Sequence, residues 1–364
     1  MTSIHLIAAA RPNFMKVAPL YHSLSKTGWA NPVLVHTGQH YDHNMSDAIL
    51  NDLKVPAPDF HLGVGSGSHA EQTGNVMIAY EKVCLEHRPD WIVVVGDVNS
   101  TAACAMVGAK LWIPVVHLEA GLRSRDRRMP EEINRLVTDA IADVLWTPSE
   151  DGDENLIAEG VPAERIDRIG NIMIDSFEML RETIEASDAQ QRLGLQAGNF
   201  GMVTLHRPSN VDAAESLEPI VAALESAAAE LPIVFVAHPR TIKGLENFGL
   251  KDRLDAAQNI TLLEPVPYVN FMSLVTGAKL VITDSGGLQE ETTYLGIPCL
   301  TLRENTERPI TVTMGTNELV TTDTLSDNLH RILAGDWKQG ARPPLWDGRT
   351  AERAVVALQR RSKR

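Results

Sequence analysis

Short apolar runs alternate with helical patterns along this chain, and the whole alternation occurs twice. In the first half, runs typical of buried strands lie at residues 4–9, 32–37, 91–95, 114–118 and 144–147, with helical patterns near 14–26, 68–88, 100–110 and 131–142. After a looser segment at 179–199, strands are expected at 202–205, 233–237, 260–263, 280–283 and 299–302, with helices near 214–230, 268–276, 288–296 and 324–334. Such an order forms parallel sheets with helices on both faces. The sequence therefore predicts an α/β fold.

Length, charge and cysteine content narrow the class of protein further. A chain of 364 residues exceeds one typical core, which predicts two domains. The net charge of −14 argues against a nucleic acid or an anionic membrane as a partner. No uncharged run reaches the roughly 18 to 20 residues that a membrane span needs. Cys84, Cys104 and Cys299 are far apart in apolar settings, as expected of buried thiols in a reducing compartment, so we expect a cytoplasmic protein.

The segment VITDSGGLQEETTYLGIP carries the clearest binding signal. A buried strand is followed by Ser285, Gly286 and Gly287, and a helical pattern begins at once. Two glycines at such a turn let backbone N–H groups approach a phosphate at the helix N-terminus. Glu291 lies about one helical turn further on, where its carboxylate could accept hydrogen bonds from ribose hydroxyls. An ordinary turn, with glycines chosen for tight packing, is the alternative.

Two cations and two carboxylates follow strands of the first half. Arg11 and Lys16 flank the start of the first expected helix, where the helix dipole disfavours cations, so an anionic ligand would explain them. Solvated surface charges are the alternative. Asp97 and Glu119 each follow a strand, and neighbouring strand ends share one edge of a parallel sheet. These two carboxylates are therefore expected to face one cleft and to serve in proton transfer, although Asp97 could instead cap a loop.

Another helix is expected to begin at Pro130, because proline is favoured at a first helical position. Its apolar stripe consists of Ile133, Leu136, Val137, Ala140 and Ile141. The opposite face carries Glu131, Arg135 and Thr138. These side chains are either exposed or line a cleft, and their spacing fits both interpretations.

Histidine and arginine follow strands in the second half. His206 and His238 each lie directly beyond a strand, outside any core stripe, which favours a role as general acid or base or as a donor to a diphosphate. Arg308 follows the last expected strand, and its guanidinium could bind a phosphate through two bonds.

Two motifs are rejected as cofactor or metal sites. GSGSHA resembles a dinucleotide-binding pattern, but the segment before it is a poor strand. DGD at residues 151–153 resembles a metal-binding motif, yet it opens an acidic helix N-terminus. We therefore expect neither a cofactor nor a metal.

Eight motifs together resemble the non-hydrolysing UDP-N-acetylglucosamine 2-epimerases, in the order that this family shows. They are ARPNFMKVAPL, HTGQHYD, GDVNST, HLEAGLRS, MPEEINR, LHRPSNVD, TDSGGLQEE and TERP, and they span most of the chain. The resemblance implies two Rossmann-like domains of the GT-B type, with the nucleotide-sugar in the cleft between them. We place the N-terminal, acid/base domain at residues 1–168 with 348–364, and the C-terminal, UDP-binding domain at 169–347.

The resemblance also implies a reaction and a set of residues. In this family UDP leaves the anomeric carbon as a base removes the C2 proton, which gives a glycal; UDP then re-adds as a proton arrives on the opposite face, which gives UDP-N-acetylmannosamine. Motif matches make the catalytic candidates Asp97, Glu119, Glu131 and His206. UDP-sugar binding is implied for Arg11, Lys16, Arg135, Phe271 beside the uracil, Ser285, Gly286, Gly287, Glu291 on the ribose, and Arg308. Neither a redox cofactor nor a metal is implied, and a homodimer is expected.

Departures from the family pattern leave the substrate and regulation open. Ala9, Asn13 and Val266 stand where members often have Gly, Glu and Gln. Asp42 differs from the usual residue of the loop where some bacterial members bind a second, activating UDP-N-acetylglucosamine. Several motifs also look like those of relatives that act on diacetamido uronic acid sugars, so the groups at C3 and C6 stay open. The sequence is also compatible with a hydrolysing 2-epimerase that releases N-acetylmannosamine and UDP, with a glycosyltransferase of the same fold type, and with a nucleotide-sugar sensor without turnover.

Overall fold

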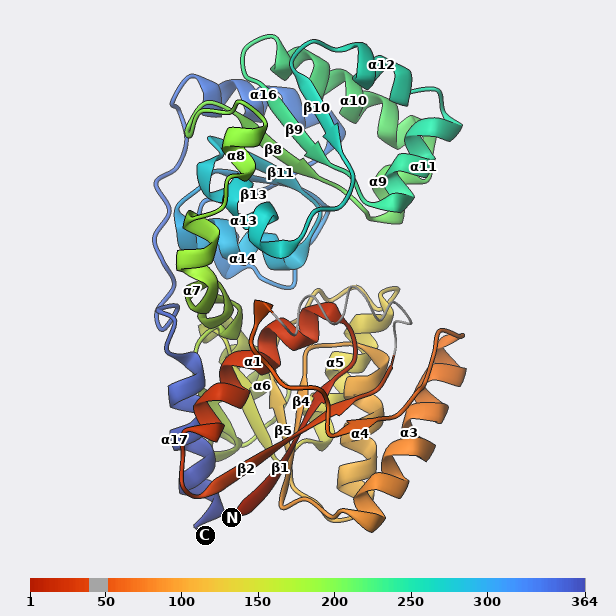
Figure 1. Cartoon of the computed structure of the whole chain (residues 1–364), viewed down its shortest axis with the longest axis vertical. Helices are drawn as coiled ribbons and strands as arrows, with labels where there is room; N and C mark the ends of the chain where they lie inside the picture. Colours follow the sequence, from red (N-terminus) through yellow and green to blue (C-terminus); the bar gives the residue numbers. More distant parts are fainter. Residues whose placement is uncertain (39–51, 364) are drawn as a thin grey trace. The chain divides into compact units, whose positions relative to one another are not determined.

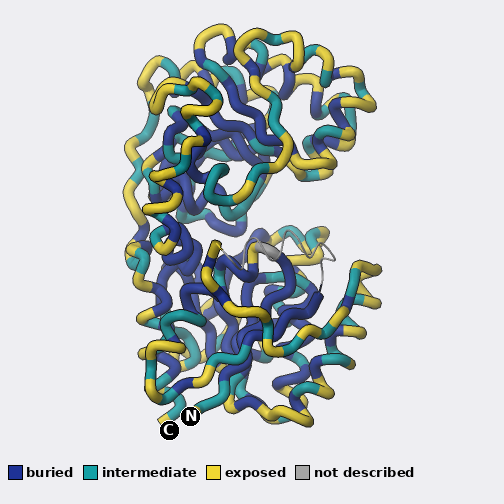
Figure 2. Tube along the Cα trace, viewed as in Figure 1, coloured by how far each residue is buried: buried dark blue, intermediate teal, exposed yellow. Residues whose placement is uncertain are grey.

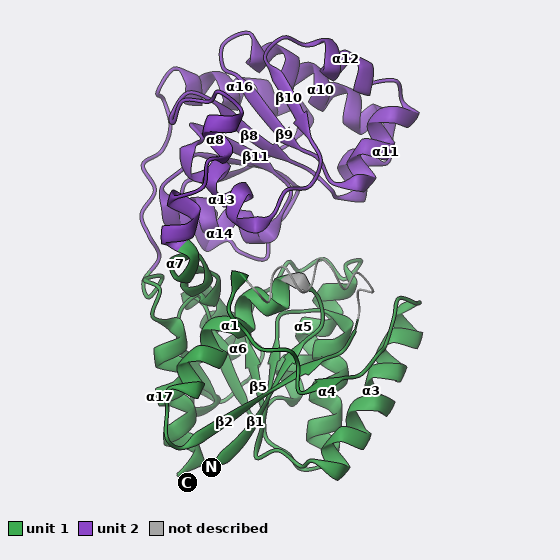
Figure 3. Cartoon of the chain, viewed as in Figure 1, with its two compact units in different colours: residues 1–180, 344–364 green, residues 181–343 purple. Residues whose placement is uncertain are grey.

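The chain divides into unit 1, residues Met1–Leu180 with Pro344–Arg364, and unit 2, residues Arg181–Pro343 (Figure 3). The computed structural model describes residues 1–38 and 52–363, and of Arg11 the backbone alone. The division expected at 168 and 347 differs from this one because helix α7 (Ile172–Glu185) begins in unit 1 and ends in unit 2. The first half of α7 packs in unit 1, where Phe177 is buried and the Ser176 hydroxyl donates to the Met15 carbonyl.

The described residues of unit 1 form a seven-stranded parallel sheet in the order β3-β2-β1-β4-β5-β6-β7. Its strands are β1 (Thr2–Ala8), β2 (Ala30–His36), β3 (Phe60–His61), β4 (Trp91–Val95), β5 (Val115–Leu118), β6 (Val144–Thr147) and β7 (Ile166–Arg168). Besides α7, its helices are α1 (Arg11–Ser25), α3 (His69–Glu86), α4 (Asn99–Lys110), α5 (Pro130–Ile141), α6 (Glu150–Ala158), the 3-10 turn η1 (Ala163–Arg165) and α17 (Thr350–Ser362). Helix α1 packs against α17, while α4 packs between α3 and α5 (Figure 1). Helices on both faces explain why the central strands are continuous apolar runs.

The described residues of unit 2 form a six-stranded parallel sheet in the order β10-β9-β8-β11-β12-β13. Its strands are β8 (Gly201–Thr204), β9 (Ile233–Val236), β10 (Ile260–Leu263), β11 (Leu280–Thr283), β12 (Cys299–Leu302) and β13 (Asn317–Val320). Its helices are α8 (Ala189–Arg192), α9 (Pro208–Val211), α10 (Ala214–Ala228), α11 (Pro239–Asn247), α12 (Lys251–Ala256), α13 (Tyr268–Gly277), α14 (Gly286–Leu295), α15 (Ile310–Thr313) and α16 (Thr322–Leu333). The core lies along the sheet, where the chain is buried (Figure 2).

The C-terminal helix is fixed to unit 1 by a carboxylate from another helix. Asp175 of α7 accepts the backbone N–H groups of Thr350 and Ala351 at 3.0 and 2.8 Å, so it caps the N-terminus of α17. Just before this helix, Trp346 Nε1 donates to the Pro148 carbonyl at 3.0 Å. These bonds explain why residues from Pro344 onward belong to unit 1 although they follow unit 2 in the sequence.

In each sheet, successive strands are added first toward one edge and then toward the other. The two strands at which this order reverses are β1 and β4 in unit 1, and β8 and β11 in unit 2. Parallel sheets bind ligands beyond the carboxyl ends of strands at such a switch point. Lys16 follows β1 and Asp97 follows β4, whereas His206 follows β8 and Ser285 follows β11. The topology therefore places a group of expected site residues at the switch point of each unit.

The α/β architecture with parallel sheets is confirmed, and every strand expected from the sequence is present. Strands β3, β7 and β13 were not expected, because they are short, lie at or near sheet edges and carry polar residues. Among the described residues, no helix combines the length and the apolar character that crossing a membrane requires.

Candidate active site

Glu119 occupies a strained and buried position just beyond β5. Its φ of +73° lies in the left-handed region, which costs a residue with a side chain roughly 1–3 kcal/mol. Its Oε2 pairs with Lys16 Nζ of α1, and the side chain is 4% exposed. Its Oε1 is buried with no hydrogen-bond partner among the described residues, an arrangement that costs roughly another 1–3 kcal/mol. Strain and an unsatisfied carboxylate at one residue indicate a chemical role rather than a stabilising one.

Asp97 follows β4 and is held by helix α5. Arg135 Nη1 pairs with its Oδ2, and Asn134 Nδ2 donates to its backbone carbonyl at 2.9 Å. The Asp97 side chain is 30% exposed, so its carboxylate remains accessible. Glu132 orients Arg135 through a 2.7 Å ion pair. Burial alone would raise the pKa of Glu132, but the Ser124 N–H and Arg135 hold that pKa below its usual value.

Gly96 lies against the Lys16–Glu119 pair of unit 1 and directly precedes Asp97 in the chain. A Cβ built on Gly96 would lie 3.5 Å from Glu119 Oε2 and 3.5 Å from Lys16 Nζ. Gly96 also has a φ of +68°, so glycine suits both the backbone and the crowded surroundings. The Lys16–Glu119 and Asp97–Arg135 ion pairs therefore both adjoin the turn that contains Gly96.

Helix α5 turns its polar side toward the interior of unit 1. Its buried residues are Glu132, Arg135, Thr138 and Asp139. Ile133, from the expected apolar stripe, is 36% exposed, and Glu131 is exposed as well. The sequence left open whether Glu131 and Arg135 are exposed; in the structure Arg135 is buried and Glu131 is exposed. The buried charges of this helix pair with other charged side chains and with backbone N–H groups.

In unit 2, the N-terminus of α14 has the features of an anion site. Ser285 precedes the helix without a side-chain cap, so the first N–H groups of α14 have no intrahelical partner. A Cβ on Gly286 would lie 2.6 Å from Glu307 Oε1 and 2.7 Å from Arg308 Nη1, whereas one on Gly287 would meet nothing within 4 Å. The Arg308 guanidinium therefore lies against the first residue of this helix. It also pairs with Glu290 at 3.0 Å and with Glu307.

Asp284 anchors the loop that follows β8. Its fully buried carboxylate accepts the N–H of His206 at 3.0 Å, the N–H of Arg207 at 2.9 Å and Asn210 Nδ2 at 3.0 Å. It also lies 3.0 Å from Nδ1 of His206, whose side chain is 44% exposed. Burial alone would raise the pKa of Asp284, but these donors hold that pKa below its usual value. An ionised Asp284 requires a proton on Nδ1, which leaves Nε2 of His206 to meet a ligand.

Glu291 is a buried carboxyl group on α14. It accepts a 2.6 Å hydrogen bond from the Tyr268 hydroxyl of α13. Burial and the neighbouring Glu290 raise the pKa of Glu291 to about 7, against the lowering effect of Tyr268. At neutral pH, Glu291 is therefore close to half protonated. Phe271 lies on the same helix as Tyr268 and is partly buried.

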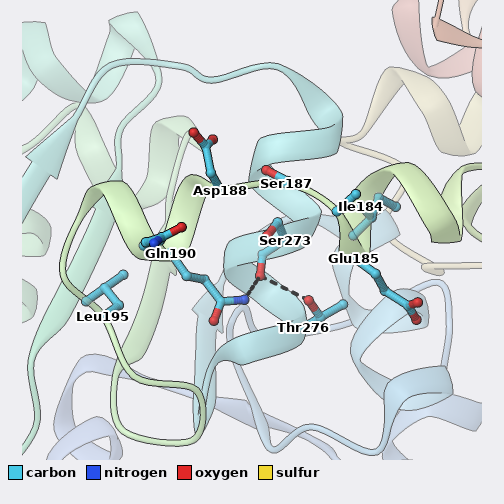
Figure 4. Close-up of a pocket in the computed structure, with 10 residues that line it drawn as sticks. Ile184, Glu185, Ser187, Asp188, Gln190, Leu195, Ser273 and Thr276 are labelled. Atoms are coloured by element: carbon cyan, nitrogen blue, oxygen red, sulfur yellow. Dashed lines mark hydrogen bonds between the residues drawn. The ribbon is translucent and has the colours of Figure 1, made fainter.

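A separate hollow of about 630 Å³ lies within unit 2 (Figure 4). Residues of α7, α8, α13 and the segments between α7 and β8 line it. Gln190 Nε2 and the Thr276 hydroxyl both donate to the Ser273 carbonyl in its wall, at 2.5 and 3.0 Å. None of its lining residues is an expected site residue.

Comparisons with known proteins agree with this geometry. The family model described as UDP-N-acetylglucosamine 2-epimerase matches residues 22–359. The chain therefore belongs to the UDP-N-acetylglucosamine 2-epimerase family. The UDP-N-acetylglucosamine 2-epimerase of Methanocaldococcus jannaschii is 39% identical over 367 residues, which cover 98% of each protein. A crystal structure of that organism's enzyme in complex with UDP-GlcNAc and UDP matches with a TM-score of 0.89, covering 99% of this chain and 100% of that one.

A second relative has a different sugar in its name. The UDP-2,3-diacetamido-2,3-dideoxy-D-glucuronate 2-epimerase of Pseudomonas aeruginosa is 38% identical over 318 residues, which cover 86% of this chain and 87% of the relative. Membership of the 2-epimerase family is thus established, while the sugar that this member accepts is a separate question.

Within this 2-epimerase, the expected residues fall into two groups. In unit 1, Lys16 pairs with Glu119 and Arg135 pairs with Asp97, and both ion pairs adjoin the turn that contains Gly96. The members in unit 2 are His206, Phe271, Ser285, Gly286, Gly287, Glu291 and Arg308, all of them on or beside β8, α13, α14 and the segment after β12. Glu131 is exposed on α5 and stands apart from the buried pairs. The Arg11 side chain, Asp42 and most of the HTGQHYD motif lie outside the described residues.

Several residues that contact the candidate site residues were missed from the sequence. Asp284 precedes the glycine turn directly, and its place at a strand end was a usable signal. Glu132 is three residues before Arg135, a spacing that fits an ion pair on one helix face. Nothing in the sequence indicated that Tyr268 binds Glu291, because the two residues are 23 positions apart and meet only in the fold.

Proposed function

We propose that the chain interconverts UDP-N-acetylglucosamine and UDP-N-acetylmannosamine by eliminating and re-adding UDP through a glycal. Glu119 carries the proposal. A base for the C2 proton must be ionised, shielded from water and free of a donor on one oxygen, because a hydrogen bond there would lower its basicity. Glu119 has one oxygen paired with Lys16 and the other buried without a partner among the described residues.

The second proton transfer is assigned to Asp97 or Glu131. Inversion at C2 needs a donor on the opposite face of the sugar ring from the base. Arg135 and Asn134 hold Asp97 in place, and its carboxylate stays accessible. Glu131 is exposed on α5 and has the freedom to meet a sugar.

Departure of UDP is assigned to unit 2. The uncapped N-terminus of α14, Arg308 and Nε2 of His206 would stabilise charge on the diphosphate as its bond to C1 breaks. Glu291 would bind the ribose and Phe271 the uracil. Arg11, Lys16 and Arg135 would complete the positive surroundings of the substrate.

Product analysis tests the proposal against hydrolysis. The purified protein is incubated with UDP-N-acetylglucosamine, and proton NMR follows the anomeric signals. We expect both UDP-linked epimers and no accumulation of free sugar. Free N-acetylmannosamine with stoichiometric UDP would establish the hydrolysing reaction instead.

A modified sugar is the second candidate substrate, because a relative that is 38% identical is named for a diacetamido glucuronate. The kcat/KM values for that UDP-sugar and for UDP-N-acetylglucosamine, measured on one preparation, decide between them. A clear preference for the diacetamido sugar would make that UDP-sugar the proposed substrate, and the proposed reaction would stay the same.

A homodimer and a cytoplasmic location belong to the same proposal. Ile78 and Leu85 of α3 are 59% and 66% exposed, and Trp112 is 89% exposed, so unit 1 has apolar surface for a second copy. The cytoplasmic location is supported by Cys84, Cys104 and Cys299, which are free and buried, as expected in a reducing compartment. Light scattering on the wild type and on Leu85→Glu tests the dimer; a wild-type monomer would contradict it.

A further inference from the structure

His117 of β5 is completely buried between two hydrogen-bond acceptors. Its Nε2 lies 2.8 Å from the Gly96 carbonyl, and its Nδ1 lies 2.5 Å from Asp139 Oδ1 of α5. A carbonyl oxygen has no proton to give, so Nε2 must donate to Gly96. The protonation of this ring therefore depends on which partner holds the proton between Nδ1 and Asp139.

The surroundings of Asp139 favour its ionised form. Its Oδ2 pairs with Arg123 Nη1 at 2.7 Å and accepts the Gly121 N–H at 3.0 Å. Arg123 is itself held by Glu159 at 2.6 Å. An ionised Asp139 next to an unprotonated Nδ1 would set a lone pair against a carboxylate at 2.5 Å, which is repulsive.

We propose that His117 is a positioning residue for Asp97, held as an imidazolium by Asp139 and fixing the Gly96 carbonyl through Nε2. This inference rests on the proposed role of Asp97 in proton transfer. His117 and Asp139 do not touch substrate in this account; they act through the turn that follows β4.

The turn is bonded on each side of Asp97. The Gly96 N–H donates to the Leu118 carbonyl at 3.0 Å, and His117 holds the Gly96 carbonyl. Asn134 holds the Asp97 carbonyl at 2.9 Å. A rotation of the Gly96–Asp97 peptide would move the Asp97 carboxylate away from Arg135. Because Gly96 has a φ of +68° and glycine is conformationally permissive, this turn needs external bonds to stay in one conformation.

Packing alone does not explain why a histidine paired with an aspartate occupies this buried position. A buried ion pair is often no more stabilising than apolar residues of the same volume, and the neighbouring β5 residues Val115, Val116 and Leu118 are apolar. The buried charges are better explained by the geometry that they impose on the turn.

The first test measures protonation without using activity. The full-length protein, labelled with ¹⁵N-histidine and free of ligand, is studied by NMR at pH 8, and His117→Gln assigns the signal. We expect both ring nitrogens of His117 to carry protons while exposed histidines are neutral. A single protonated nitrogen at pH 8 would overturn the imidazolium.

The second test measures positioning. His117→Gln keeps an amide that can donate to a carbonyl but removes the charge, and Asp139→Asn removes the partner carboxylate. We expect each to lower kcat at least about tenfold while KM changes less than about threefold, because UDP binding is assigned to unit 2. His5→Gln is the control, since His5 is 1% exposed in the same sheet but its Nδ1 contacts the Tyr80 hydroxyl rather than the turn that follows β4.

The outcomes separate this inference from the proposed function. Wild-type kcat in folded His117→Gln and Asp139→Asn would overturn positioning. If His117→Gln does not fold, Asp139→Asn still tests positioning, and it also assigns the His117 signal, which moves when the partner carboxylate is removed. No epimerisation by the wild type would contradict the proposed function and the role of Asp97, while the NMR result would judge the imidazolium independently.

Discussion

Asp284 binds His206 twice: its carboxylate accepts the His206 backbone N–H at 3.0 Å and lies 3.0 Å from Nδ1 of the same residue. The pair joins the ends of β11 and β8, the two strands at the switch point of unit 2. One buried carboxylate therefore fixes the loop, the ring and its tautomer together. In the proposed reaction, this arrangement directs Nε2 toward the diphosphate.

Asp284→Asn should destabilise unit 2 by about 1–3 kcal/mol, because an amide replaces a buried acceptor that serves several donors. Urea unfolding measures the change. Asp212→Asn is the matched control, since Asp212 forms a solvent-exposed pair with Arg240 in the same unit. Equal shifts of the unfolding midpoint in both variants would contradict the anchoring role.

Gly286→Ala and Gly287→Ala should have opposite effects. A Cβ at 286 would lie 2.6 Å from Glu307 Oε1, while one at 287 would meet nothing within 4 Å. We expect the first to lose about 1–3 kcal/mol of stability through overpacking, and the second to gain up to about 1 kcal/mol from better helix propensity. Thermal unfolding and calorimetric UDP titration check both. Weakened UDP binding in Gly286→Ala with unchanged stability would show that packing is not the cause.

Glu291 should make unit 2 less stable as pH rises. Its pKa is raised from 4.5 to about 7 in the folded protein, so between these values the folded state keeps a proton that the unfolded state has lost. Stability should therefore fall through this window by up to about 3 kcal/mol. Glu291→Gln should match the wild type at pH 4.5 and exceed it at pH 8, at the expense of UDP affinity. The exposed Glu264→Gln serves as control, and an identical pH profile in wild type and Glu291→Gln would refute the assignment.

His5 should contribute to acid sensitivity of unit 1. Burial, and to a lesser extent His87, lower the pKa of His5 from 6.5 to about 4. Between these two pH values, His5 is protonated in the unfolded chain but not in the folded chain. Stability is therefore complete above pH 6.5 and falls as pH drops toward 4, by up to about 3 kcal/mol. Urea unfolding of His5→Leu between pH 7 and 4.5 should show a shallower decline than the wild type. A decline of equal steepness would show that other groups cause it.

Much of the fold could be predicted from the sequence, because most strands are apolar runs between clear turns. Strands β4 and β11 also end directly before polar residues, which placed Asp97 and Ser285 at strand ends. Strand β13, with the sequence NELV, lacks an apolar run, and its pairing with β12 is a tertiary effect. The family resemblance that followed from the motifs is confirmed by the family model.

The site was harder to predict where buried charges contradict the usual pattern. On α5 the spacing fitted both an exposed and a buried polar face. The buried charges there pair by contacts that only the fold shows, Glu132 with Arg135 and Asp139 with Arg123. The left-handed backbone of Glu119 has no sequence signal, because glutamate rarely adopts it. The bond between His117 and Asp139 joins residues 22 positions apart and required the fold to be seen.

Hydrogen exchange at C2 tests the central claim most directly. The wild type and Glu119→Gln are incubated with UDP-N-acetylglucosamine in D₂O, and NMR follows deuterium at C2 of the UDP-linked sugars. We expect deuterium in both epimers with the wild type, and a rate lower by about 10²-fold or more with Glu119→Gln, which retains a similar shape but no base. Epimers formed without deuterium, or exchange at the wild-type rate in Glu119→Gln, would contradict the assignment of Glu119 as the base.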